Sequence, residues 1–183
     1  MNKVDKVLLE NAKALVDLMD ETASAVLPSE IVDVVKMHSK LAVASAWIPV
    51  PGADIAAGAA SIWGMYIRIN GKIGIPIREN IIKSIGSGVA TNLAGYVAMS
   101  GVASAIKFIP GLGSIGGGVL MSAAMYALTL TSGYVYLRAL QTVAKRNGRN
   151  ISGSEVADAV KKVLSDKGGV KAFFDESKRS YKK

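Results

Sequence analysis

The chain has 183 residues, a length typical of one domain, and half of these residues are hydrophobic while only 20% are charged. Soluble domains carry about 25% charged residues, so this composition favours a chain that contacts lipid or is unusually buried. Cysteine is absent and histidine occurs once, which excludes disulfides, thiolate metal sites and any multi-histidine metal centre within one chain.

The net charge of +8 is unevenly distributed along the chain. Residues 1–40 contain five basic and seven acidic residues, residues 41–137 five and two, and residues 138–183 twelve and five. A basic segment after an apolar centre suits anionic lipid headgroups as well as nucleic acid. Because few aromatic residues accompany the basic ones, we expect membrane lipid and no nucleic acid as a partner.

Two amphipathic helices are expected at the start of the chain. The first covers residues 4–26 and places one apolar face together: Val4, Leu8, Leu15, Met19 and Val26. Ser29 is the expected N-cap of the second, whose apolar side contains Ile31, Val34, Val35, His38, Leu41 and Ala42. We interpret His38 as a buried, hydrogen-bonded histidine, and the alternative is a pH sensor.

The middle of the chain is nearly free of charge. Asp54 is the one charged residue between Leu41 and Ile67, and residues 84–106 and 108–137 contain none. Spanning a bilayer takes about 20 predominantly apolar residues, so each of the last two segments is long enough. The first segment is divided by "IPVPGAD", which fits a re-entrant or interfacial hairpin.

Two parts of this apolar middle repeat each other. "VASAWIPVPGADIAAGAASIWGMY" (43–66) aligns with "VASAIKFIPGLGSIGGGVLMSAAMY" (102–126). Proline and glycine break a helix, which predicts bends at Pro49, Pro51 and Gly52, and at Pro110 and Gly111. Asp54 and Ser114 are then the expected caps of the helices that follow, although Asp54 at membrane depth has the alternative of a functional ionisable group. The predicted unit is helix, Pro-Gly bend, cap and helix, present twice.

Residues 111–116 also match the G-x-G-x-x-G pattern of a dinucleotide-binding loop. That loop follows a strand within a β-α-β unit, whereas the preceding "GYVAMSGVASAIKF" is predicted to be helical. We therefore favour a bend over a phosphate-binding loop. No catalytic residues, cofactor or metal site are expected, and the protein is predicted not to be an enzyme.

The glycines have a second use in this interpretation. Small residues four apart allow helix backbones to approach closely, as in paired membrane helices. The helix-packing positions predicted in this way are Gly58, Gly64, Gly101, Gly113, Gly117 and Gly118. A tightly packed water-soluble bundle is the alternative.

Basic residues flank the apolar segments. Arg68, Lys72, Arg78 and Lys83 lie between two of them, and Lys145, Arg146 and Arg149 follow the last. The positive-inside rule would place both groups against lipid headgroups on the cytoplasmic side, and the alternative is an ordinary solvated surface. Beyond them, Ser152 and Glu155 have the spacing of a capping box before a short helix.

The motifs "PVPGAD" and "KFIPGLGSIGGG" carry a resemblance to a known family. Over roughly residues 30–175 the chain resembles the YcjF-type domain of unknown function, which often accompanies Era-like or immunity-related GTPase domains. The resemblance implies a membrane-associated helical domain and a separate GTPase as a partner. It implies no activity, because this chain lacks the GTPase domain.

The sequence thus predicts one all-α domain, a helical bundle built from two repeated hairpins. Its parts are amphipathic helices over 1–40, apolar hairpins over 41–137 and a basic helical tail over 138–183. The function expected is a membrane-associated protein on the cytoplasmic side that self-associates through Gly, Ala and Ser faces and shapes, tethers or permeabilises a membrane. The alternative is a soluble, cytoplasmic helical module or adaptor that forms oligomers and works with a separate GTPase.

Overall fold

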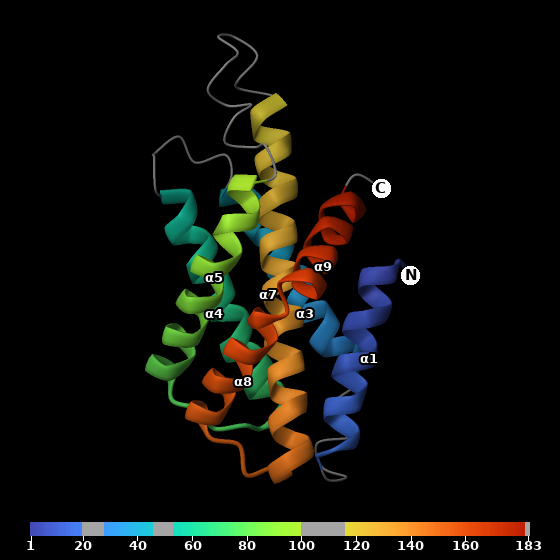
Figure 1. Cartoon of the computed structure of the whole chain (residues 1–183), viewed down its shortest axis with the longest axis vertical. Helices are drawn as coiled ribbons and strands as arrows, with labels where there is room; N and C mark the ends of the chain where they lie inside the picture. The colour runs from blue at the N-terminus through green and yellow to red at the C-terminus, as the bar shows by residue number, and fades with distance from the viewer. Residues whose placement is uncertain (20–27, 46–52, 100–115, 182–183) are drawn as a thin grey trace.

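The structure is a computed structural model that describes residues 1–19, 28–45, 53–99 and 116–181. These residues form seven helices and no strand, which confirms the predicted all-α class (Figure 1). The helices are α1 (Lys3–Asp17), α3 (Pro28–Ser45), α4 (Ala53–Ile73), α5 (Glu79–Met99), α7 (Gly116–Asn147), α8 (Gly153–Ser165) and α9 (Lys167–Ser180).

Helix α1 has the predicted apolar face but is shorter than predicted. Asn2 caps it by accepting a hydrogen bond from the Asp5 backbone N–H, and Val4, Leu8, Leu15 and Met19 are buried. The helix ends at Asp17 because the Leu18 and Met19 N–H groups bond to carbonyls three residues back, which tightens the last turn. The prediction that the first helix continues without interruption to Val26 is therefore wrong, because α1 ends at Asp17.

Helix α3 corrects two details of the prediction. It begins at Pro28, so Ser29 lies inside the first turn and is not the N-cap; proline is favoured at a first helical position because its missing N–H has no helical partner there. Leu41 is 57% exposed, because no described helix covers that side of α3 near its end. The rest of the predicted apolar side is buried: Ile31, Val34, Val35, His38 and Ala42.

Helix α7 is the central element of the bundle. It contacts each of the other six described helices, and from Ala123 to Ala144 most of its apolar side chains are buried, around its whole circumference. A helix that is apolar all round is expected to be a core helix or a membrane span, and here the surrounding helices bury it. The segment "YVYL" lies within α7 and is helical, as predicted.

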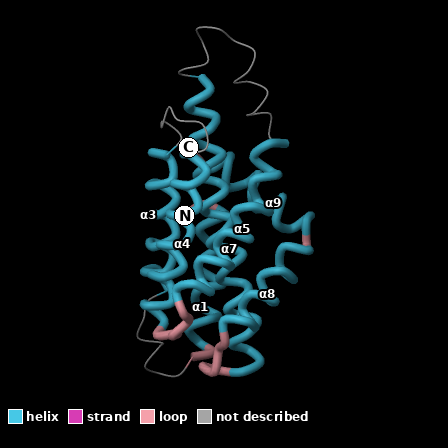
Figure 2. Tube along the Cα trace, turned by 90° about the vertical axis from the view of Figure 1, so that its left-hand side faces the viewer, coloured by secondary structure: helices cyan, strands magenta, loops and turns pink. Residues whose placement is uncertain are grey.

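The ends of the bundle differ in which connections they carry. Helices α3 and α5 end, and α4 and α7 begin, at the end drawn at the top of Figures 1 and 2. At the opposite end lie the α4–α5 and α7–α8 connections, each with a left-handed glycine: Gly74 at φ 69° and Gly148 at φ 58°. A Cβ on Gly74 would lie 3.3 Å from Arg149 Nη2, so these two connections are neighbours.

The predicted bends lie outside the described residues: Pro49, Pro51, Gly52, Pro110 and Gly111. Ser114, Gly101 and Gly113 also fall outside them, so the repeated hairpin stays a prediction. The backbone of Asp54 is in the first turn of α4, one residue after its start at Ala53, rather than at the N-cap.

Candidate functional site

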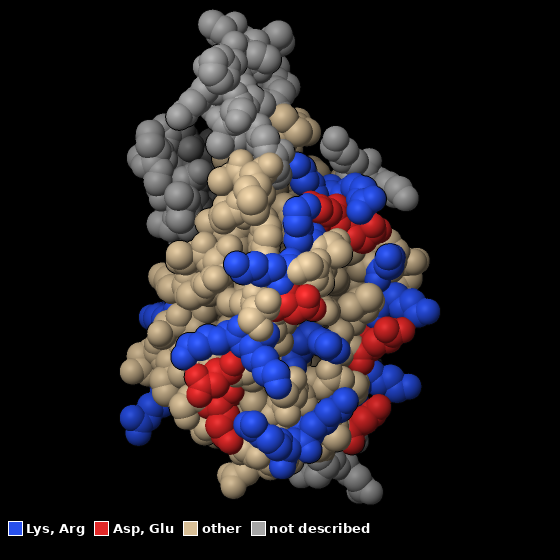
Figure 3. All heavy atoms as spheres, in the orientation of Figure 1, with Lys and Arg blue, Asp and Glu red and all other residues tan. Residues whose placement is uncertain are grey.

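Exposed apolar side chains gather at the end of the bundle where α5 ends and α7 begins. Met99 is 69% exposed and Val119 is 45% exposed, and the exposed Leu41 of α3 belongs to the same end. We call these three residues the apolar end. Figure 3 shows uncharged side chains over α5 and the start of α7, while charged ones cover α8, α9 and the lower part of the same face.

An apolar pocket of about 190 Å³ adjoins this end. Helix α4 contributes Gly58 and Ala59, α5 contributes four small side chains including Ala94 and Ala98, and α7 contributes two methionines and Leu128. A Cβ on Gly58 would lie only 2.5 Å from Met125 Cε, so this predicted packing glycine lies against α7. Gly117 and Gly118 are in the first turn of α7.

Helix α5 exposes a row of small side chains. The row has the spacing of one helix face and consists of Ser84, Gly88, Thr91, Gly95 and Ala98. A Cβ on Gly88 or Gly95 would have no neighbour within 4 Å. No other described helix therefore covers this face, and neither Gly88 nor Gly95 is among the predicted packing glycines.

The seven basic residues predicted to bind headgroups are all exposed. Three of them pair with acids: Lys72 Nζ lies 2.7 Å from Glu30, Lys83 Nζ 2.7 Å from Glu79, and Arg146 Nη2 3.7 Å from Glu155. Arg68 donates to the Met37 sulfur at 3.5 Å, and Arg149 lies beside Gly74. Lys72 is in the last turn of α4, Arg78 directly precedes α5, and Lys145 and Arg146 are in the last turn of α7. These helix ends lie opposite the apolar end (Figure 1).

His38 is buried as predicted, at 6% exposure, and packs between α3 and α4. Gly64 leaves room for its ring, because a Cβ there would lie 3.0 Å from His38 Cε1. Ser61 Oγ donates to the His38 carbonyl at 2.9 Å and lies 3.5 Å from Nδ1, while Nε2 has no partner. Burial first, and then the Arg68 charge, lower the pKa of His38 below its usual value.

One described helical stretch, Val119–Asn147 of α7, is long and apolar enough to cross a membrane by length and composition. In the apolar part of this stretch, 72% of the residues are buried by the rest of the bundle. Burial of this extent is typical of a core helix. No second stretch of this kind is found among the described residues. Because residues 100–106 lie outside them, the possible span at 84–106 stays a prediction.

No group of three or more histidine, aspartate or glutamate side chains in the described ranges is placed to hold a metal ion. The glycine pattern at 111–116 lies outside these ranges except for Gly116, the first residue of α7. Its interpretation as a bend stays a prediction.

Comparisons with known proteins were made by family, by sequence and by structure. No protein-family model and no solved structure matches the chain. A protein named magnetosome membrane protein 22, from Magnetospirillum gryphiswaldense, is 33% identical over 107 residues, which are 58% of this chain. The chain spans about half of that relative, 55% of its length.

Proposed function

We propose that this protein associates with a membrane through the apolar end of its helical bundle and self-associates through a face of small residues. The observation that carries the proposal is the position of Leu41, Met99 and Val119 at one end of the bundle. The same end is where the chain enters and leaves residues 46–52 and 100–115, which contain one charged residue, Lys107, between them. The name of the relative, a membrane protein, supports the same assignment.

The packing of α7 favours attachment at the surface over a membrane-spanning hairpin. Inserting α7 would remove it from six helices, and would separate the buried core of the bundle from its main scaffold. Attachment through the apolar end requires no such rearrangement. Each large apolar side chain that enters the bilayer would contribute roughly 1.5–3 kcal/mol.

Attachment in this orientation assigns a different role to the opposite end of the bundle, which carries Lys72, Arg78, Lys83 and Lys145 and which we call the basic end. Helix α4 has 21 residues and is therefore about 31 Å long, so residues near its far end lie beyond the headgroups of the same bilayer leaflet. Arg78 and Lys145 would then face away from the attached membrane. Among shaping, tethering and permeabilising, this arrangement favours tethering, with the basic end free to meet a second anionic surface.

Self-association is proposed through the exposed row on α5. Gly88 and Gly95 present open backbone, and a second α5 could approach closely over them. The pocket beside this row, lined partly by Ala94 and Ala98, adds apolar surface that a partner helix would cover.

The second candidate is a soluble oligomeric module, which could work with a separate GTPase as the family resemblance implies. The observation that favours it is the burial of α7, because this explains the apolar composition of residues 119–137 without lipid. Membrane flotation separates the two candidates.

The attachment test is flotation of the full chain with vesicles of phosphatidylcholine and phosphatidylglycerol. We expect the wild type to float and to stay bound in high salt, and Met99→Asp and Val119→Asp to lose binding. Ile67→Asp is the matched control, because Ile67 is also exposed, at 38%, but lies in α4 away from the apolar end. The proposal fails if the wild type stays with the soluble fraction, or if only neutralisation of Arg78 and Lys145 abolishes flotation.

Self-association is tested by sedimentation velocity in detergent-free buffer. We expect Gly95→Leu to reduce the assembled fraction, because its side chain would separate two α5 helices. Gly71→Leu is the control, since Gly71 is exposed on α4 and also has open space around it. Equal behaviour of both variants and the wild type would contradict assembly through α5.

A further inference from the structure

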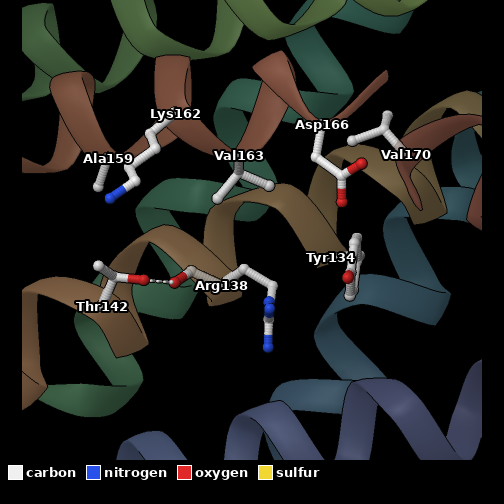
Figure 4. Close-up of a pocket in the computed structure, with 8 residues that line it drawn as sticks. All are labelled: Tyr134, Arg138, Thr142, Ala159, Lys162, Val163, Asp166 and Val170. Atoms are coloured by element: carbon white, nitrogen blue, oxygen red, sulfur yellow. Dashed lines mark hydrogen bonds between the residues drawn. The ribbon is translucent and has the colours of Figure 1, made fainter. Parts of the chain in front are cut away.

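A pocket of about 250 Å³ lies between α7 and the junction of α8 with α9, away from the apolar end (Figure 4). Tyr134, Arg138 and Thr142 line it from one face of α7, four residues apart. Lys162 and Asp166 line it from α8 and the junction, and three small apolar side chains complete it. The pocket therefore combines two basic groups, one carboxylate and two hydroxyl groups with an apolar wall.

The two basic groups in this pocket are not neutralised. Their neighbours are paired: Lys161 with Asp158 at 3.0 Å, and Lys171 with Asp175 at 2.5 Å. Neither Arg138 nor Lys162 forms an ion pair within the described chain. An anion entering the pocket would meet two positive charges without displacing an existing partner.

Asp166 keeps its negative charge, which leaves the lining of the pocket a net charge of +1, but Asp166 is engaged at the start of α9. It is the N-cap of α9, and Oδ1 accepts a hydrogen bond from the Gly169 N–H at 3.0 Å. A carboxylate in this position interacts with the positive end of the helix dipole. The junction of α8 and α9 is thereby fixed, and with it the position of Lys162 above α7.

We propose that this pocket binds a small phosphorylated molecule, with Arg138 and Lys162 contacting the phosphate. Arginine and lysine are the usual phosphate ligands, and arginine can donate two parallel hydrogen bonds. In Figure 4 Lys162 extends from α8 toward α7, while the guanidinium of Arg138 turns away from α8. Binding therefore includes a rotation of the Arg138 side chain, which is exposed and free to move.

The position of the pocket favours a soluble phosphate ester over a lipid headgroup of the membrane attached at the apolar end. Arg138 lies 22 residues after Gly116, so it is about 33 Å along α7 from the start of that helix. A bilayer contacting the apolar end would keep its headgroups near that start, since the polar region of each leaflet is only about 5–8 Å thick. The pocket, at about 250 Å³, is slightly smaller than most small-molecule sites, which fits a phosphate group with a short organic part.

The test uses the full chain, with inorganic phosphate and glycerol 3-phosphate as probes. We expect saturable shifts of the Thr142 and Gly169 amide resonances, and an affinity about tenfold lower in Arg138→Gln and in Lys162→Gln. Lys161→Gln is the matched control, because Lys161 is equally exposed on α8 but paired with Asp158. All three substitutions remove one charge from an exposed side chain, and circular dichroism checks that the fold is retained.

Two results would overturn the proposal. The first is the absence of saturable shifts in the wild type, or an equal loss of affinity in Lys161→Gln, which would indicate general charge attraction. The second is displacement of glycerol 3-phosphate by phosphatidylglycerol vesicles in the Met99→Asp variant, which would make a lipid headgroup the occupant. Since Met99→Asp tests attachment separately, failure of the pocket and failure of the proposed membrane role are distinguishable.

Discussion

Tyr66 of α4 and Tyr136 of α7 lie face to face in the core, with ring centroids 3.9 Å apart and ring planes 9° from parallel. The Tyr66 hydroxyl donates to the Ser132 carbonyl at 3.0 Å, and the Tyr136 hydroxyl donates to Asn70 Oδ1 at 3.0 Å. Burial raises the pKa of both tyrosines above the usual value, so both hydroxyls stay protonated. This pair fixes the register of α4 against α7 with polar groups that are all buried.

The first prediction concerns the hydroxyl of Tyr136. We expect Tyr136→Phe to reduce the free energy of unfolding by about 1–3 kcal/mol, because it leaves the buried Asn70 amide without its partner. Urea denaturation measures the change. The control is Tyr134→Phe, which keeps the ring stacked on Phe173 and alters a half-buried hydroxyl, and an equal loss in this variant would contradict the prediction.

The second prediction concerns the close approach of α3 to α7 at Gly133. A Cβ there would lie 2.6 Å from Val35 Cγ1 and 3.4 Å from Met65 Sδ. We expect Gly133→Ala to destabilise the protein, because overpacking costs about 1–3 kcal/mol and outweighs the gain in helix propensity of about 1 kcal/mol. Thermal unfolding of Gly133→Ala is compared with that of Gly88→Ala, where the added methyl meets open space and stability should rise. The prediction is wrong if both variants change in the same direction.

The third prediction is a pH dependence that comes from His38. Because the folded protein lowers the pKa of His38 below 6.5, the unfolded chain binds the proton more readily between the two pKa values. Stability is therefore fully present above about pH 6.5 and falls as the pH decreases below it. Denaturant unfolding from pH 7.5 to 5.5 should show this slope in the wild type and lose it in His38→Gln. An unchanged slope in the variant would assign the effect to other groups.

The fourth prediction tests the cap of α8. Ser152 accepts from the Glu155 N–H, and the Glu155 carboxylate bonds back to the Ser152 N–H, so the predicted capping box is confirmed. Hydrogen bonds from Ser152 and Asn147 lower the pKa of Glu155. We expect Ser152→Ala to reduce stability by about 1 kcal/mol and to raise the pKa of Glu155, measured by NMR titration. Ser152→Thr retains the hydroxyl and should restore both values; no recovery would argue against the cap.

Local signals in the sequence determined much of the fold. The spacing of Val4, Leu8 and Leu15 predicted the buried face of α1, and the Ser152–Glu155 spacing predicted the start of α8. These succeeded because helix periodicity and capping depend on residues within one or two turns. The predicted end of α1 and the predicted start of α3 were less accurate. Several local patterns permit a helix to end near Asp17 or to begin near Pro28, and short-range signals do not choose among them.

Tertiary structure alone decided where the apolar segments lie and which polar groups meet. Residues 119–137 have the composition of a membrane span, yet most of them are buried among six helices. Hydropathy measures the avoidance of water and does not distinguish lipid from protein. Asn70 and Tyr136 are 66 residues apart, and Arg138 and Lys162 belong to different helices, so no local pattern could pair them. The sequence by itself determined the helices and their apolar faces through short-range contacts, while the packing around α7 decided the apolar end, the tyrosine pair and the basic pocket, because these depend on long-range contacts.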